Sequence, residues 1–242
     1  GINYTNYEYD LKNKNAINSN LIYATYIDTY NRLWVGTEEG LCLYNRNLNK
    51  FENIDLKEAF TVGYKNTITV KNIIQENNGN LLVGTYAHGL LKLNLKNLKV
   101  TTVQLNLKLN SNSKINCFAK NKEGIIYLGT DLGLLKYDSK NNEVQSSTWN
   151  KSKNKITYPI ESLYFDTNKN LWVGTVSHGL FKIASNQKTA QIENFAISKN
   201  KILSVIGIDS HTLLCGTEND GLFLINDKGI ILHNYLNSKS DN

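Results

Sequence analysis

The chain has 242 residues, of which 40% are hydrophobic and 20% are charged. This composition is ordinary for a folded globular protein, and no apolar run reaches the roughly 18 residues that a membrane-spanning helix needs. The net charge of +6 is spread over single lysines and arginines, without the basic stripe of a nucleic-acid-binding protein, so nucleic acid is excluded as an expected partner.

One five-residue phrase recurs five times along the chain. It reads Leu-Trp-Val-Gly-Thr at 33–37 and 171–175, with close variants at 81–85, 126–130 and 213–217. A second glycine, followed by leucine, comes four or five residues after the first. The first glycines of the five copies are 48, 45, 45 and 42 residues apart, which is the period of propeller blades. We centre the repeats on these glycines: Gly36, Gly84, Gly129, Gly174 and Gly216.

Each repeat divides into four short apolar runs separated by turn residues. In the fourth repeat these runs are 160–165, 171–175, 180–183 and 190–195. Val, Ile, Tyr and Thr are common in them, and the three-and-four spacing of helices is absent. The pattern predicts an all-β fold, a β-propeller of four-stranded antiparallel blades, with five blades in a single domain over 1–242. The two glycines of each copy should close the hairpin between the second and third strands.

Blades must stack because a single sheet cannot bury both of its faces. The large aromatic residues of the phrase, Trp34, Tyr127 and Trp172, are therefore expected in the core between blades. Cys42, Cys117 and Cys215 lie far apart in apolar runs and are expected to be small core residues.

The two ends of the chain resemble each other. Residues 1–7 match residues 229–235, and both occupy the place of a fourth strand. The sequence therefore predicts six strands of the fourth kind but only five sets of first, second and third strands. This excess favours a segment of a larger propeller, such as a seven-bladed one. A closed five-bladed ring is the alternative.

The variable residues between the two glycines of each copy are expected on one face of the propeller, where they would specify a ligand. The candidate ligand-binding residues are Glu38, Glu39, Tyr86, His88, Asp131, Ser177, His178, Glu218, Asn219 and Asp220. The connections that precede each first strand add Asn18, Asn20, Tyr64, Asn66, Lys114, Asn116 and Tyr158 to the same face.

Few features of this set favour catalysis or metal binding. His88 and His178 occupy equivalent places and suggest a metal or acid–base pair, but no third ligand or nucleophile has a fixed spacing from them. Glu38 and Glu39 are adjacent in one turn, unlike the two carboxylates that flank a glycosidic bond. We expect no catalytic residue, no metal site and no cofactor.

The phrase Leu-Trp-Val-Gly-Thr, a short loop, Gly-Leu and a closing Tyr-Asp or Tyr-Asn resembles the two-component regulator propeller repeat. The copies at 33–45, 126–138 and 171–183 carry this resemblance. It implies the sensor region of a membrane histidine kinase or hybrid two-component system, located in the periplasm or outside the cell and responding to oligosaccharides.

The expected function is therefore extracytoplasmic ligand sensing, and the chain itself is not expected to be an enzyme. The expected partners are an oligosaccharide or other polar small molecule and a second copy in a homodimer, with membrane attachment only through segments outside this chain. A protein-interaction scaffold is the main alternative, and a propeller lyase or hydrolase is a weaker one.

Overall fold

The computed structural model describes residues 4–60, 66–105, 113–147, 156–184 and 191–236. The chain divides into two compact units, Gly1–Ile115 and Asn116–Asn242, and each is described by itself. The expectation of a single domain over 1–242 stays a prediction, as does the number of blades in the ring.

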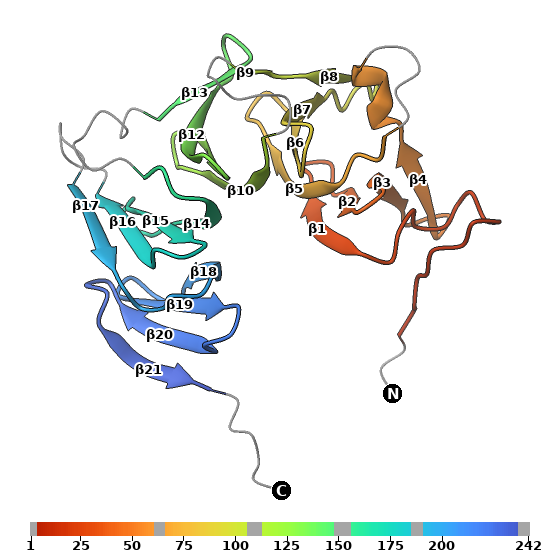
Figure 1. The fold of residues 1–242 in the computed structure, drawn as a ribbon. Helices are drawn as coiled ribbons and strands as arrows, with labels where there is room; N and C mark the ends of the chain where they lie inside the picture. The colour runs from red at the N-terminus through yellow and green to blue at the C-terminus, as the bar shows by residue number, and fades with distance from the viewer. Residues whose placement is uncertain (1–3, 61–65, 106–112, 148–155, 185–190, 237–242) are drawn as a thin grey trace, which may run out of the picture. The chain divides into compact units, whose positions relative to one another are not determined.

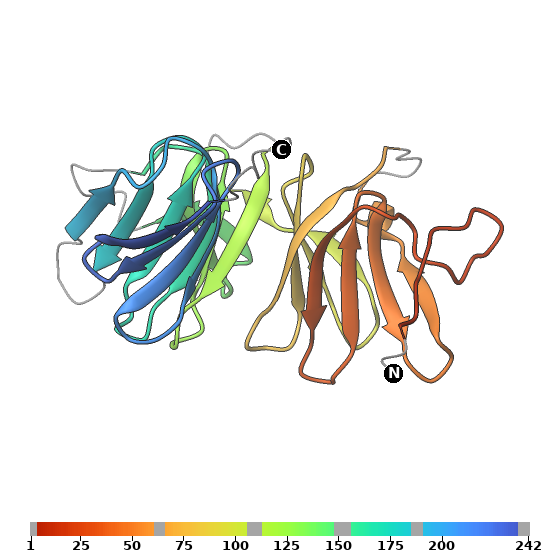
Figure 2. The ribbon, with the colours of Figure 1, turned by 90° about the horizontal axis from the view of Figure 1, so that it is seen from below.

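The first unit contains two blades and a short 3-10 helix, with strands in chain order across each blade. Figure 2 shows the four strands of the first blade, in red to orange, side by side. The first blade is β1 (Ile22–Ile27), β2 (Leu33–Thr37), β3 (Gly40–Asn45) and β4 (Lys50–Ile54); η1 (Leu56–Ala59) follows; the second blade is β5 (Val70–Gln75), β6 (Leu81–Thr85), β7 (Leu90–Leu93) and β8 (Val100–Thr102), followed by the two-residue β9 (Gln104–Leu105).

The second unit contains three blades built in the same way (Figure 1). Its first strand begins at Ile115, the last residue of the first unit, and continues into the second. The strands are β10 (Ile115–Lys120), β11 (Ile126–Thr130), β12 (Gly133–Asp138) and β13 (Glu143–Ser146); β14 (Ile160–Phe165), β15 (Leu171–Thr175), β16 (Leu180–Ala184) and β17 (Gln191–Phe195); and β18 (Ile202–Gly207), β19 (Thr212–Thr217), β20 (Leu222–Asn226) and β21 (Ile231–Tyr235).

The predicted blades are confirmed. In the fourth repeat, β14 and β15 have the expected bounds, β16 is one residue longer than expected, and β17 is described from Gln191 because 185–190 lie outside the described residues. In every blade the Gly-Thr phrase ends the second strand, and the register pairs it with the start of the third, as Thr37 with Gly40 in the first blade.

The core lies between successive blades within each unit. In the first unit, Trp34 and Leu41 of the first blade pack with Val70, Val83 and Leu91 of the second. In the second unit, Tyr127 and Trp172 have the same role toward the blades that follow them. All three aromatic residues are buried, as expected, and so are the three cysteines. Side chains alternate between the two faces of a strand, so the aromatic residue points to the same face as the glycine two places later. This face of the second strand packs against the next blade.

The two glycines of the phrase have different tasks. Gly40, the second glycine of its copy, has φ of 135°, a value that L-residues avoid. Gly36, the first glycine, has no such φ, but a Cβ atom there would lie 2.5 Å from Cγ1 of Val70 on the next blade. The first glycine therefore permits close packing of blades, and the second permits the hairpin.

The expected strand at 1–7 is wrong where the structure describes it, since residues 4–10 form no strand; residues 1–3 lie outside the described residues. That strand was expected to belong to a blade other than the first. The described part of the segment packs against the first blade instead, where the Phe51 N–H donates to the Asn15 carbonyl over 2.9 Å and Tyr7 packs edge-on against Tyr44 and Phe51. At the other end, β21 is the predicted fourth strand.

Candidate functional site

The hairpin between the second and third strands is built in the same way in all five blades. The threonine hydroxyl that ends the second strand donates to the carbonyl of the second glycine and accepts the N–H of the residue before that glycine. In the second blade these bonds join Thr85 to Gly89 over 2.7 Å and to His88 over 2.9 Å. The other four pairs of bonds belong to Thr37, Thr130, Thr175 and Thr217. The candidate ligand-binding residues therefore sit on closed, hydrogen-bonded tips.

A second bond ties four of these tips to the first strand of their own blade. The residue after the threonine donates its N–H to a carbonyl just before that strand, as Tyr86 does to Thr69 over 3.0 Å. The equivalent pairs are Glu38 with Leu21, Val176 with Pro159 and Glu218 with Lys201, each at 3.0 Å. In these four blades the hairpin tips and the starts of the first strands thus lie together at one end, as the sequence predicted.

In the first blade, Glu38 is half-buried and Glu39 is exposed. Thr67 directs its hydroxyl toward Oε2 of Glu39 at 3.5 Å, which is a long contact. The single hydroxyl proton of Thr37 is shared between Oδ1 of Asn18 at 2.7 Å and the Gly40 carbonyl at 3.3 Å, so Asn18, predicted for the same face, also supports the tip. Of the other residues expected there, Tyr64 lies outside the described residues.

In the second blade, Tyr86 is 47% exposed, whereas His88 is half-buried against the edge of the Phe60 ring, 5.7 Å between centroids. Burial lowers the pKa of His88, because the charged imidazolium loses solvation. His88 is therefore expected to be neutral near pH 7, and Tyr86 presents the larger accessible surface.

In the second unit, Asp131 is half-buried, and Ser177 and His178 are exposed. The His178 ring stacks on Tyr158, with centroids 3.6 Å apart and an interplanar angle of 13°, and its Nδ1 lies 3.0 Å from the Ser177 hydroxyl. This stacked pair forms an aromatic surface with polar atoms at its edge.

In the fifth blade, Glu218 and Asn219 are exposed and Asp220 is half-buried. Glu218 forms an ion pair with Lys201 over 2.9 Å. Asp220 accepts hydrogen bonds from the Ser198 hydroxyl and the Asn200 amide, over 2.5 and 2.9 Å, and these bonds lower the pKa of its carboxyl. Asp220 is thus an anion engaged in fixing its own loop.

The arrangement gives no positive support for a metal centre. His88 and His178 belong to different units. Within the described ranges, no group of three His, Cys, Asp or Glu residues is placed to hold a metal ion.

Two residues at the starts of first strands, Lys71 and Tyr23, were not predicted. Lys71, the second residue of β5, lies 4.0 Å from the ring centroid of Tyr23, the second residue of β1. Lys114, which was predicted for this face, donates to the Tyr86 hydroxyl over 3.0 Å and lies 4.3 Å from its ring centroid. The bond from Lys114 lowers the pKa of Tyr86, and the charges of Lys114 and Lys71 lower it further. The start of the first strand, not only the hairpin, therefore supplies side chains to this surface.

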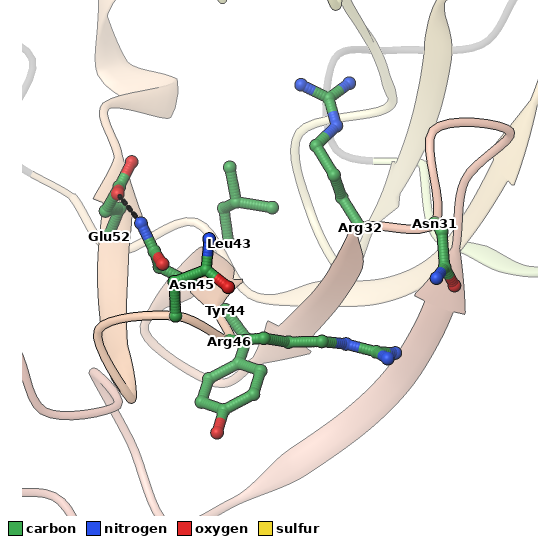
Figure 3. Close-up of a pocket in the computed structure, with 8 residues that line it drawn as sticks. Asn31, Arg32, Leu43, Tyr44, Asn45, Arg46 and Glu52 are labelled. Carbon is green, nitrogen blue, oxygen red and sulfur yellow. Dashed lines mark hydrogen bonds between the residues drawn. The ribbon is translucent and has the colours of Figure 1, made fainter.

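A separate pocket of about 250 Å³ lies at the other end of β2, between the turn that precedes it and the β3–β4 hairpin (Figure 3). It is lined by both arginines of the chain, Arg32 and Arg46, and by Asn45, whose amide donates to Glu52 over 3.3 Å. Its volume is below the roughly 300 Å³ at which ligand pockets usually begin. It can hold only a small polar group.

Comparison with known families supports the resemblance seen in the repeats. Residues 16–39 match the family Two component regulator propeller. Histidine kinase P4 of Formosa agariphila is 41% identical over 71 residues, which is 27% of this chain and 5% of the kinase.

Solved structures share the fold. The extracellular domain of a putative hybrid two component system from B. thetaiotaomicron aligns over 96% of this chain with a TM-score of 0.65 and 15% identity. The extracellular domain of a putative one component system from the same organism aligns over 94% with a TM-score of 0.56 and 17% identity. This chain spans 36% and 44% of those two proteins.

Virginiamycin B lyase from Staphylococcus aureus also aligns, over 90% of this chain and 71% of the lyase, with a TM-score of 0.66 and 11% identity. At such identities the likeness establishes the β-propeller fold alone. In the described part of the chain, no helix is long and apolar enough to cross a membrane.

Proposed function

We propose that this chain, which carries two component regulator propeller repeats, is the extracytoplasmic ligand-sensing part of a two-component receptor. Its ligand is a polar small molecule of the oligosaccharide class, and it acts in the periplasm or outside the cell. Catalysis, including any kinase activity, would belong to segments outside this chain. The similarity to extracellular domains of putative one- and two-component systems supports this proposal.

The observation that carries the proposal is the exposure of aromatic rings at the hairpin end of the blades. Tyr86 in the first unit and His178, which is exposed and stacks on the half-buried Tyr158, in the second offer flat ring surfaces with polar atoms at their edges. Sugars present apolar C–H faces and equatorial hydroxyls, so aromatic faces combined with hydrogen-bonding groups suit them. The rigid tips that hold these residues limit the entropy lost on binding.

Signalling requires that the ligand favour one of two arrangements of the receptor. A homodimer of this chain would provide them, with the ligand binding one arrangement more tightly than the other. Size-exclusion chromatography with light scattering, with and without saturating ligand, would measure the oligomeric state. A monomer under both conditions would contradict the dimer part of the proposal.

The function is tested by a thermal-shift screen of the whole chain against neutral and charged oligosaccharides and polar metabolites. A ligand that binds only the folded state raises the melting temperature in a saturable way. Tyr86→Ala should reduce the shift caused by a ligand of the first unit. Tyr30→Ala is the control, because Tyr30 is 63% exposed but lies in the turn before β2, at the other end of the blade. A screen in which no compound raises the melting temperature contradicts the proposal.

A protein-interaction scaffold is a second candidate, favoured by apolar side chains on the fifth blade. Leu203, Ile206 and Ile208 on or beside β18 are 46%, 57% and 57% exposed. Ile231 and Leu232 on β21 are 45% and 50% exposed. If saccharides fail in the thermal-shift screen and Ile206→Ser abolishes association with a purified partner protein, the scaffold would replace the sensor.

A further inference from the structure

One face of the fifth blade is left open in the described part of the chain. In three earlier blades, the side that bears the aromatic residue of the repeated phrase packs against the next blade, and Trp34, Tyr127 and Trp172 are buried there. The equivalent residue of the fifth blade, Leu214, is only half-buried. We call this side of the fifth blade the open face, and the register places on it Ser204, Ile206, Leu214, Leu222, Leu224 and Tyr235.

The open face has a hollow above the first glycine of its phrase. In the fourth blade, a β-branched residue of the next blade fills this place, because a Cβ atom on Gly174 would lie 2.8 Å from Cγ2 of Ile202. The same holds in the first blade. On Gly216 such an atom would meet only Ser204 of its own blade. The fifth blade therefore has room for a β-branched side chain that it does not receive.

The open face is also apolar and free of fixed charge. Ile206 and Tyr235 are 57% and 51% exposed. The other side chains that the register places there are Thr212, Asn226 and His233, so the face carries no Lys, Arg, Asp or Glu. Such residues make up 20% of the chain, and a sheet face without them can meet a copy of itself without repulsion between like charges.

The first blade is not ready to cover this face. Its matching side, which bears Val35, Cys42 and Phe51, is buried under Ile17 of the segment before β1. Tyr7 of the same segment packs on the Phe51 ring. A complete blade could pack there only by displacing the segment. The open face of a second copy can be reached without any such displacement.

We propose that the open face is the interface of a symmetric homodimer, in which the fifth blades of two copies stack face to face. A two-fold axis brings the same patch of both copies together. Ile206 of each copy then fills the hollow above Gly216 of the other, as a β-branched residue of the next blade does in the first and fourth blades. Burial of the apolar side chains drives association. This inference rests on the proposed function, since it names the interface of the homodimer that the receptor would use.

Sedimentation velocity of the whole chain from about 1 to 200 μM tests the interface, because dimer formation depends on protein concentration. The mass should approach twice that of the chain and rise no further, since a symmetric contact is closed. Species larger than a dimer would mean a head-to-tail contact and would overturn the inference. A chain that stays monomeric throughout would also overturn it and leave the open face to a further blade or to another protein.

Ile206→Asp brings a carboxylate into the interface and should weaken the dimer at least about tenfold. Ile27→Asp is the matched control, because Ile27 is 56% exposed and lies on the first strand of another blade. Gly216→Ala puts a methyl group into the hollow and should weaken the dimer too, while the melting temperature of the dilute monomer stays nearly unchanged. Equal dissociation constants of the Ile206→Asp and Ile27→Asp variants would overturn the inference.

The outcomes separate this inference from the proposed function. A dimer that Ile206→Asp leaves intact would overturn the open face as its interface and leave the homodimer standing. A monomeric chain would overturn both the interface and the homodimer. Ligand sensing would still stand if a saccharide raised the melting temperature of that monomer in the thermal-shift screen.

Discussion

The indole N–H of Trp34 donates to Oδ2 of Asp28 over 2.9 Å, and the indole of Trp172 makes the same bond to Asp166 over the same distance. In both blades the acid comes six residues before the tryptophan and begins the turn between the first and second strands. Asp28 also accepts the N–H groups of Tyr30 and Arg32 and the guanidinium Nε of Arg32. The Asp28 carboxylate thus accepts the hydrogen bond of the buried indole N–H and also holds the turn through its bonds to the backbone.

Replacement of Asp28 by alanine is expected to lower the free energy of unfolding by about 2–3 kcal/mol, because it leaves the buried indole N–H and two backbone N–H groups without acceptors. Urea unfolding followed by tryptophan fluorescence would measure the loss. In the Trp34→Phe background, which lacks the indole donor, the same replacement should cost less. Equal costs in the two backgrounds would show that the Trp34–Asp28 bond contributes nothing.

Asp28 should also make stability depend on pH. Burial raises the pKa of its carboxyl, but the bonds from Trp34 and Arg32 outweigh this effect and leave the pKa below its ordinary value. The carboxylate therefore stabilises the folded chain above the unfolded pKa of about 4, and this contribution is lost as pH falls through the lower folded pKa. Urea midpoints measured between about pH 5 and 2 should fall less for Asp28→Asn than for the wild type. Parallel curves would contradict this role.

Much of the fold could be predicted because its signals are local. The bounds of β14 and β15 follow from apolar runs and turn residues, and the burial of Trp34, Trp172 and Tyr127 follows from their repetition. The expected strand at 1–7 failed because likeness to 229–235 does not reveal the contacts that Tyr7 and Asn15 make with Phe51 of the first blade.

The site was harder to predict because its contacts join distant parts of the chain. The sequence placed Tyr86, His88 and the connection before β5 on one face, but it did not reveal the bond from the Tyr86 N–H to the Thr69 carbonyl or which side chains of β5 lie there. Lys71 and Tyr23 lie within strands that read as ordinary core runs. The threonine of each repeat was also left without a task, because its hydroxyl bonds depend on loop geometry.

That threonine is open to a direct test in the second blade. Thr85→Val keeps the shape of the side chain but removes the hydroxyl that bonds to Gly89 and His88. Since Thr85 is fully buried, no water replaces these bonds, and a loss of about 1–2 kcal/mol in unfolding free energy is expected. Thr85→Ser keeps the hydroxyl and should cost clearly less. Chemical denaturation of both variants decides the matter, and a valine variant as stable as the serine variant would count against the bond.

The first glycine of the phrase should tolerate a methyl group in the fifth blade but not in the fourth. A Cβ atom on Gly174 would lie 2.8 Å from Cγ2 and 2.9 Å from the carbonyl oxygen of Ile202 on the next blade. On Gly216 it would meet only the side chain of Ser204, which is exposed and can rotate. Gly174→Ala is therefore expected to cost about 2 kcal/mol, and Gly216→Ala less than about 0.5 kcal/mol. Thermal unfolding of the two variants provides the comparison, and similar losses would refute this account of blade packing.

The three cysteines should resist thiol reagents while the chain is folded. Burial raises the pKa of Cys42 to about 11 and that of Cys215 to about 12, and it raises the pKa of Cys117 as well. The thiolate is the reactive form, so at about pH 8 a thousandth or less of the Cys42 side chain would be reactive even if a reagent reached it. A disulfide reagent that reports released thiol should give almost no signal from the native chain and three equivalents in denaturant. Rapid release of one equivalent of thiol from the native chain would mean that one blade opens readily. Cys→Ser variants would identify the reactive cysteine.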